Sequence, residues 1–169
     1  MLIDRLWMGG SVLLLAALMI RLVSRDRLRE MWAVLLTMQG LKWLLGALKA
    51  QFHLAAFPKR LFPFATQQDF ATDFAVCPSL AVVYAVIVNG RSPRDRLLIT
   101  VAFAIAFAVW SLAMTRWTNL QVHHRWSFGI DFLCVLILLP LSTRIGSWIV
   151  SETREREGAV RLHGSQSAH

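Results

Sequence analysis

Four charged side chains lie within or beside long apolar stretches of this 169-residue chain: Lys42, Lys49, Asp73 and Asp131. Removing a charge from water is costly, so each of them is by default a candidate for a functional site. They could line an outward-opening polar cavity that binds a small ligand or an ion. Alternatively, Lys42, Asp73 and Asp131 form an ion-paired cluster that fixes helix packing, while Lys49 extends its ammonium to the lipid headgroups. For so small a protein we favour the ion-paired cluster.

A second carboxylate, Asp69, precedes Asp73 by four residues. Both would lie on one side of a helix that starts this early, and two unpaired carboxylates there could bind a cation. Lys59 and Arg60 stand in the preceding loop, however, and we expect them to neutralise the pair. Asp69 and Lys49 are therefore secondary candidates.

The two cysteines, Cys77 and Cys134, each lie about one helical turn deeper than an aspartate. Their matching depths leave a disulfide open if the two helices touch. Buried free thiols, which behave as small apolar groups, are the default prediction. The spacing fits neither a C-x-x-C redox motif nor a metal-binding cluster, so we expect no metal and no cofactor.

Familiar catalytic motifs are missing from the sequence. It contains no G-x-S-x-G, no H-E-x-x-H, no phosphate-binding loop and no dinucleotide fingerprint. We therefore predict no catalytic chemistry. A membrane-embedded enzyme acting on lipid is a remaining alternative, which would need Asp69 or Asp73 together with His53, His123 or His124.

The composition indicates the elements that must position these residues. The chain is 56% hydrophobic and only 17% charged, with a mean hydropathy of +0.52. A soluble domain carries about a quarter charged residues. The net charge of +8 is spread between apolar segments rather than gathered on one basic face, which argues against nucleic acid as a partner. The arithmetic predicts one integral membrane unit.

Five stretches approach the roughly 20 apolar residues that a membrane-spanning helix needs. We therefore predict an all-α fold, a polytopic transmembrane bundle of about five spanning helices within residues 1–150. The fourth stretch alternates small and large residues like a strand, but its length favours a helix. The expected spans are residues 6–23, 31–49, 70–88, 97–115 and 127–150.

Short loops rich in Lys and Arg resist translocation, which predicts the orientation. Eleven arginines fall in the first and third connections and the C-terminal end, against six basic residues on the other side. This bias places the N-terminus outside and the C-terminus in the cytoplasm. In that topology Lys42, Lys49, Asp73 and Asp131 all lie in the outer half of the membrane, at depths that predict Lys–Asp pairing across helices.

Small residues and prolines predict how the helices approach one another. Gly40 and Gly46 place small side chains on the second span, and such faces permit close helix packing in lipid. Trp43 lies deep in the same span, so we expect it to pack between helices. Pro78 and Pro140 remove backbone donors inside the third and fifth spans, where they should introduce kinks.

The last segment, residues 151–169, changes composition abruptly to SETREREGAVRLHGSQSAH. Its charged first half could extend the last helix by a turn or two through Glu and Arg spaced three or four apart. We expect the rest, which is rich in Gly, Ser and His, to be a disordered cytoplasmic tail.

Residues 57–84 resemble the central part of an uncharacterised family of small multi-pass membrane proteins from spore-forming Bacillus- and Clostridium-type bacteria. The resemblance rests on Phe57-Pro58, Asp73-Phe74, Pro78 and Tyr84, and a second block matches at Trp126-Ser127-Phe128. Gly129-Ile130-Asp131 replaces the family's following Pro and Tyr, and the acidic residue and Pro expected late in the fourth span are missing. The resemblance implies a bacterial cytoplasmic membrane and adds interest to Asp73, but it implies no activity.

Together these observations predict an integral protein of the bacterial cytoplasmic membrane, a small envelope or accessory protein without catalytic chemistry. Its expected partners are the lipid bilayer and either another membrane protein or a second copy of the chain. A small transporter or ion-conducting oligomer that uses the outer polar cluster is the first alternative, and the lipid-modifying enzyme is the second.

Overall fold

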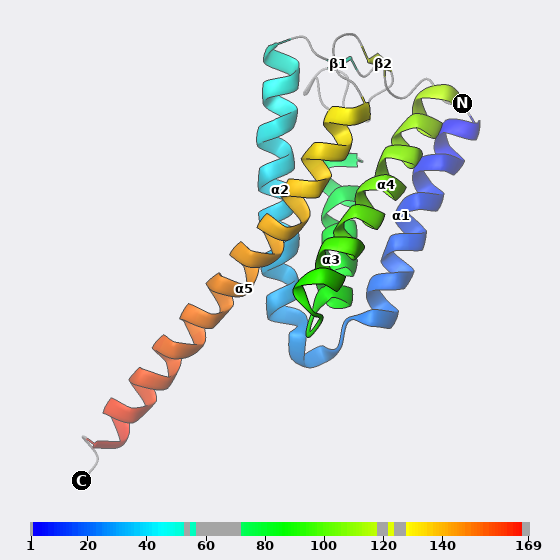
Figure 1. Ribbon diagram of the computed structural model, residues 1–169. Coiled ribbons are helices and arrows are strands. Elements are labelled where there is room, and N and C mark those ends of the chain that lie inside the picture. The colour runs from blue at the N-terminus through cyan, green and yellow to red at the C-terminus, as the bar shows by residue number, and fades with distance from the viewer. Residues whose placement is uncertain (1, 53–54, 57–71, 118–121, 124–127, 167–169) are drawn as a thin grey trace.

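The computed structural model describes residues 2–52, 55–56, 72–117, 122–123 and 128–166 (Figure 1). Within these residues the chain forms five α-helices that run alternately up and down. Their bounds are α1 (Leu2–Leu22), α2 (Leu28–Gln51), α3 (Cys77–Val88), α4 (Pro93–Trp117) and α5 (Phe128–Gln166). A 3₁₀ turn, η1 (Arg25–Arg27), precedes α2, and a π-helical turn, η2 (Thr72–Val76), precedes α3.

The alternating direction of the helices gives the bundle two distinct ends. At one end, here called the turn end, α1 is joined to α2 and α3 is joined to α4 by short connections (Figure 1). At the opposite end, the loop end, a two-residue ladder pairs β1 (Ala55–Ala56) with β2 (Val122–His123) in antiparallel register, with Ala55 opposite His123. This ladder joins the α2–α3 connection to the α4–α5 connection.

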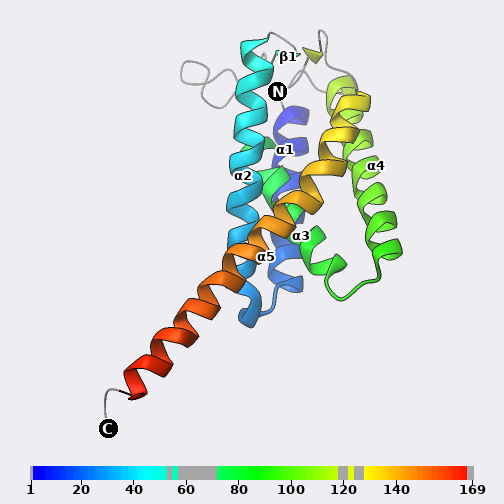
Figure 2. The same ribbon diagram turned by 60° about the vertical axis from the view of Figure 1, so that its left-hand side comes forward.

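Helix α3 forms the centre of the bundle and contacts each of the other four helices (Figures 1 and 2). Its sequence, CPSLAVVYAVIV, has no charged residue and is apolar on all sides, as expected for a helix surrounded by other helices. The other helices instead turn large apolar side chains outward. Leu13, Ile20, Leu98 and Ile137, for example, are 60–85% exposed.

Three helical segments of the described chain are long and apolar enough to cross a membrane: Arg25–Lys49, Pro93–Trp117 and Gly129–Thr153. Two apolar segments are shorter, Leu6–Leu22 and Thr72–Val88. The five helices match the five predicted stretches in order and direction. The fourth is a regular α-helix despite its strand-like alternation of small and large residues.

Helices α2 and α5 approach each other closely at Gly146. A Cβ atom on Gly146 would lie only 2.7 Å from Val34 Cγ2 and 2.8 Å from the Val34 backbone nitrogen. Of the two glycines that we expected at helix contacts, Gly46 is buried, but Gly40 is exposed, and a Cβ atom added there would meet nothing within 4 Å. The prediction for Gly40 is therefore wrong, because that residue lies on the outward face of α2.

Two further expectations need correction. Trp43 does not pack between helices, because it neighbours Lys42 on α2 and is turned outward, with 53% of its surface exposed. Helix α5 continues to Gln166, well beyond the one or two extra turns expected after residue 150, and this extension leaves the bundle (Figures 1 and 2). The helix therefore occupies most of the segment for which we expected disorder.

Candidate functional site

The first buried ion pair joins α2 to the turn that precedes α3. The Lys42 ammonium lies 3.1 Å from Asp73 Oδ1, and less than a tenth of either side chain is exposed. Lys42 belongs to the inward face of α2, together with Val34 and Met38, which are both fully buried. The four-residue spacing of this stripe keeps all three side chains on one side of the helix.

The second buried ion pair joins α2 to α5 and includes a residue of α4. Lys49 Nζ donates to Asp131 Oδ1 at 3.4 Å, and Ser111 Oγ donates to Asp131 Oδ2 at 3.0 Å. Lys49 is only 5% exposed, so our expectation that it extends to the headgroups is wrong. The physical reason is that Asp131 offers a counter-charge at the same depth inside the bundle.

These two ion pairs and Ser111 are here called the Lys/Asp network. Helix α2 supplies both cations, seven residues or about two turns apart on one face, while η2 and α5 supply the anions. The four formal charges sum to zero. Removing one member of such a buried pair leaves an uncompensated charge and typically costs about 3–5 kcal/mol. The network connects four segments of the chain: α2, η2, α4 and α5.

The position of Asp73 follows from the proline that comes after it. Pro78 has no N–H, so the carbonyls of Phe74 and Asp73 receive no hydrogen bond from the proline. The chain here takes the wider π-helical path of η2 before α3 begins, rather than the simple kink that we expected. Such turns are frequent at functional sites, because they re-aim a side chain out of regular helical register.

The cysteines are both free thiols, and the disulfide that we left open is not formed. Cys77 is fully buried and Cys134 is half-buried. Among the described residues, no group of three or more His, Cys, Asp or Glu side chains is arranged to hold a metal ion.

Several sequence candidates lie outside the described residues, namely His53, Lys59, Arg60, Asp69 and His124. His123 is described only as a member of the β1–β2 ladder. The carboxylate pair of Asp69 with Asp73 and the constellation required by a lipid-modifying enzyme therefore remain predictions. The structure does bring Asp73 to Lys42, a partner that depth matching had indicated.

Sequence reasoning did not identify the polar groups at the turn end. Tyr84 OH lies 2.7 Å from Thr100 Oγ1, which itself donates to the Arg96 carbonyl at 2.6 Å. Because this bond uses the single hydroxyl proton of Thr100, Tyr84 must be the donor in the first bond. Each of these residue types is common in helices, so only their juxtaposition in the fold reveals the chain of hydrogen bonds.

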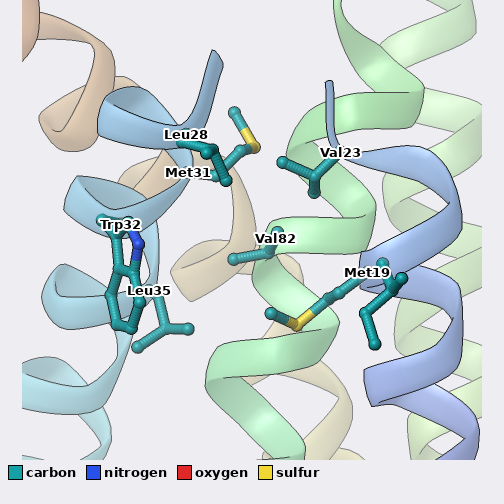
Figure 3. Close-up of a pocket in the computed structure, with 8 residues that line it drawn as sticks. Met19, Val23, Leu28, Met31, Trp32, Leu35 and Val82 are labelled. Atoms are coloured by element: carbon teal, nitrogen blue, oxygen red, sulfur yellow. The ribbon is translucent and has the colours of Figure 1, made fainter. Parts of the chain in front are cut away.

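Two pockets lie at the turn end, and neither is lined by a member of the Lys/Asp network. The smaller, of about 260 Å³, is bordered only by apolar side chains (Figure 3). Met19 of α1 and Val82 of α3 face α2 across it. It has no group that could do chemistry. The larger, of about 590 Å³, lies between α3, α4 and α5 and has a mixed polar and apolar lining.

Comparison with known proteins finds no family model that matches the chain and no curated protein or solved structure with significant similarity. The resemblance of residues 57–84 to the Bacillus- and Clostridium-type family therefore stays a prediction. What this protein does must be argued from its own side chains.

Proposed function

We propose that this chain is an integral protein of the bacterial cytoplasmic membrane that crosses the membrane five times. Its outward-facing leucines and isoleucines favour a lipid environment, because a soluble protein rarely exposes so large an apolar surface. The two shorter apolar segments, Leu6–Leu22 and Thr72–Val88, are at the lower limit of about 17 residues for a span.

The proposed orientation places the turn end in the cytoplasm and the N-terminus outside. The arginine-rich α1–α2 and α3–α4 connections lie at the same end of the bundle, and α5 extends beyond that end (Figure 1). Basic loops are retained on the cytoplasmic side during insertion, which supports this orientation.

A pair of introduced cysteines tests the orientation, in a Cys77→Ala/Cys134→Ala background. Gln51→Cys marks the loop end and Asn89→Cys marks the turn end, and both positions are exposed. In intact cells a membrane-impermeant maleimide should label Gln51→Cys, whereas Asn89→Cys should react only after permeabilisation. The reverse pattern would overturn the orientation, and labelling of both positions in intact cells would overturn the crossing between them.

We further propose that the protein is a small accessory or partner-binding membrane protein, and that the Lys/Asp network is structural. The observation that carries this proposal is that the charges of the network are buried and paired: Lys42 with Asp73, and Lys49 with Asp131. The partner would be another membrane protein or a second copy, contacted through the apolar helix faces. Neither catalytic chemistry nor a cofactor is part of the proposal.

A small transporter or ion-conducting oligomer is the second candidate. It is favoured by the position of Asp73, which lies on a π-helical turn where a change of backbone path could expose the carboxylate. Transport would require that water reaches Asp73 in some state of the protein, and that its charge is needed for flux but not for folding.

The variant Asp73→Asn separates these two functions. Under the structural proposal it leaves Lys42 buried without a full counter-charge, so the variant should accumulate poorly in the membrane and melt at a lower temperature in detergent. Asp26→Asn, at an exposed position of the turn end, is the matched control and should behave as the wild type. If Asp73→Asn instead accumulates and melts normally but loses ion flux in proteoliposomes, the transport function replaces the structural one.

A further inference from the structure

The larger pocket lies where α4 and α5 separate. The two helices are close at the loop end, where Ser111 of α4 bonds to Asp131 of α5, and they diverge toward the turn end (Figure 2). Helix α3 forms the floor of the resulting cleft through Tyr84 and Val88. The cleft holds about 590 Å³.

The cleft has a structural cause, because the middle of α5, at Gly146 and Ser147, packs on α2. Gly146 lies against the Val34 backbone, and Ser147 Oγ shares its proton between the Thr143 carbonyl at 2.9 Å and Glu30 Oε1 at 3.2 Å. Glu30 is also held by Arg27, at 3.0 Å. These contacts draw α5 toward α2, so the neighbouring side of α4 is left without a helix against it.

Two arginines flank the cleft, Arg96 on α4 and Arg144 on α5, and both are exposed. Arg96 Nε donates to the Arg91 carbonyl at 3.0 Å, which holds the guanidinium in place while its terminal amino groups stay available. Among the described residues, no acidic side chain forms a salt bridge with either arginine. Both walls of the cleft therefore carry a positive charge that no described salt bridge engages.

The rest of the lining combines hydroxyl groups with apolar surface. Thr100, Thr143 and Ser147 place hydroxyls on the two walls, and each of these donates its proton to a carbonyl of its own helix. Leu97, Leu136 and Pro140 add an apolar surface, and Leu97 continues it outward at 62% exposure. A ligand that fits this lining has an anionic headgroup and an attached apolar chain.

We propose that this cleft binds the headgroup of an anionic phospholipid of the cytoplasmic leaflet. Arg96 and Arg144 would hold the phosphate by charge-assisted hydrogen bonds, and an acyl chain would lie along Leu97, Leu136 and Pro140. Basic pockets between spanning helices on the cytoplasmic side are suited to such headgroups. The inference rests on the proposed membrane location and orientation. It commits to a lipid rather than a soluble phosphate ester because the apolar wall continues to the outer surface of the bundle.

The test is a lipid titration of the purified full-length protein in neutral detergent, followed by native mass spectrometry. Phosphatidylglycerol is compared with phosphatidylcholine, and glycerol 3-phosphate is added as a soluble competitor. Arg96→Gln/Arg144→Gln removes the two cleft arginines. The matched control Arg91→Gln/Arg94→Gln removes two exposed arginines of the same end that do not line the cleft. Equal melting temperatures without lipid verify that both variants are folded.

The wild type and the control variant should bind phosphatidylglycerol in preference to phosphatidylcholine. The cleft variant should bind it at least about 10-fold more weakly, because hydrogen bonds to charged groups are lost. Equal binding of both lipids, equal loss in both variants, or displacement by glycerol 3-phosphate at similar concentration would each overturn the proposal. The titration does not depend on which end faces the cytoplasm, so its failure would leave the cysteine-labelling result and the proposed function standing.

Discussion

Four charged side chains near the loop end of the bundle, Lys42, Lys49, Asp73 and Asp131, are buried, whereas the described arginines of the turn end are exposed or half-exposed. At the loop end, Lys42 and Lys49 each meet an aspartate in a buried position. At the turn end, Arg96 and Arg144 flank an open cleft and form no salt bridge with a described acidic residue. We propose that the same chemistry, a cation within reach of an apolar bundle, has two uses. Paired and buried charges would fix the packing of the helices, while charges at a rim would meet a ligand.

The same difference accounts for the packing of α4 against α5, which are close at the loop end and separated at the turn end. Asp131 accepts from both Lys49 of α2 and Ser111 of α4, so it draws three helices together at the loop end. No described ion pair joins α4 to α5 at the turn end, where Gly146 instead brings α5 against α2.

The largest effect should come from Asp131→Ala at the loop end. This change leaves Lys49 buried without its counter-charge and removes the acceptor of Ser111, so the free energy of unfolding should fall by about 3–5 kcal/mol. Arg144→Gln at the turn end should change it by no more than about 0.5 kcal/mol, since the residue is exposed. Denaturation in mixed detergent micelles, followed by circular dichroism, measures both. Equal effects of the two changes would remove the distinction between the ends.

A smaller loss of stability is expected from a change at Gly146, where α5 packs against α2. Gly146→Ala would place a methyl group 2.7 Å from Val34 Cγ2 and against the Val34 backbone, so it should destabilise the bundle by about 1–3 kcal/mol. Gly40→Ala is the matched control, because no atom lies within 4 Å of the added Cβ. It should be neutral or stabilising by up to about 1 kcal/mol. If both variants have the same melting temperature, the close approach of α2 and α5 at Gly146 is not present.

The smallest effect among the changes of buried residues should come from Tyr84→Phe at the floor of the cleft. The change removes one hydrogen bond to Thr100 and leaves the Thr100 bond to the Arg96 carbonyl intact, so it should cost about 0.5–1.5 kcal/mol. Because the arginines remain in place, phosphatidylglycerol binding should stay within about twofold of the wild type. Loss of lipid binding in this variant would show that Tyr84, rather than Arg96 and Arg144, is the main group that binds the headgroup.

Much of the fold and part of the Lys/Asp network could be predicted from the sequence, because placing charges among apolar residues is costly. Hydrophobic length alone predicted the five helices, and the matching depths of Lys42 and Asp73 predicted that a lysine and an aspartate would pair. The depths of Lys49 and Asp131 match as well, but the sequence offers no means of choosing between a headgroup and Asp131 as the partner of Lys49.

Other features depend on which way each helix is rotated, and a single sequence does not determine this. Gly40 and Gly146 look alike in the sequence, yet only Gly146 faces a neighbouring helix. Trp43 has the depth of a packing residue but lies on the outward face of α2. The Tyr84–Thr100 bond depends on how α3 packs against α4, and the arginine-flanked cleft depends on how α4 and α5 cross. Common hydroxyl and basic residues predict neither arrangement.

A double-mutant cycle on the first ion pair tests the structural role of the Lys/Asp network most directly. It compares the free energies of unfolding, in mixed micelles, of the wild type, Lys42→Met, Asp73→Leu and Lys42→Met/Asp73→Leu. Each single change should cost about 3–5 kcal/mol, because it leaves one buried charge without a partner. The double variant should return to within about 1 kcal/mol of the wild type, since an apolar pair of similar size can replace a buried ion pair. Single variants as stable as the wild type, or a double variant that loses the sum of both, would contradict a structural role for the network.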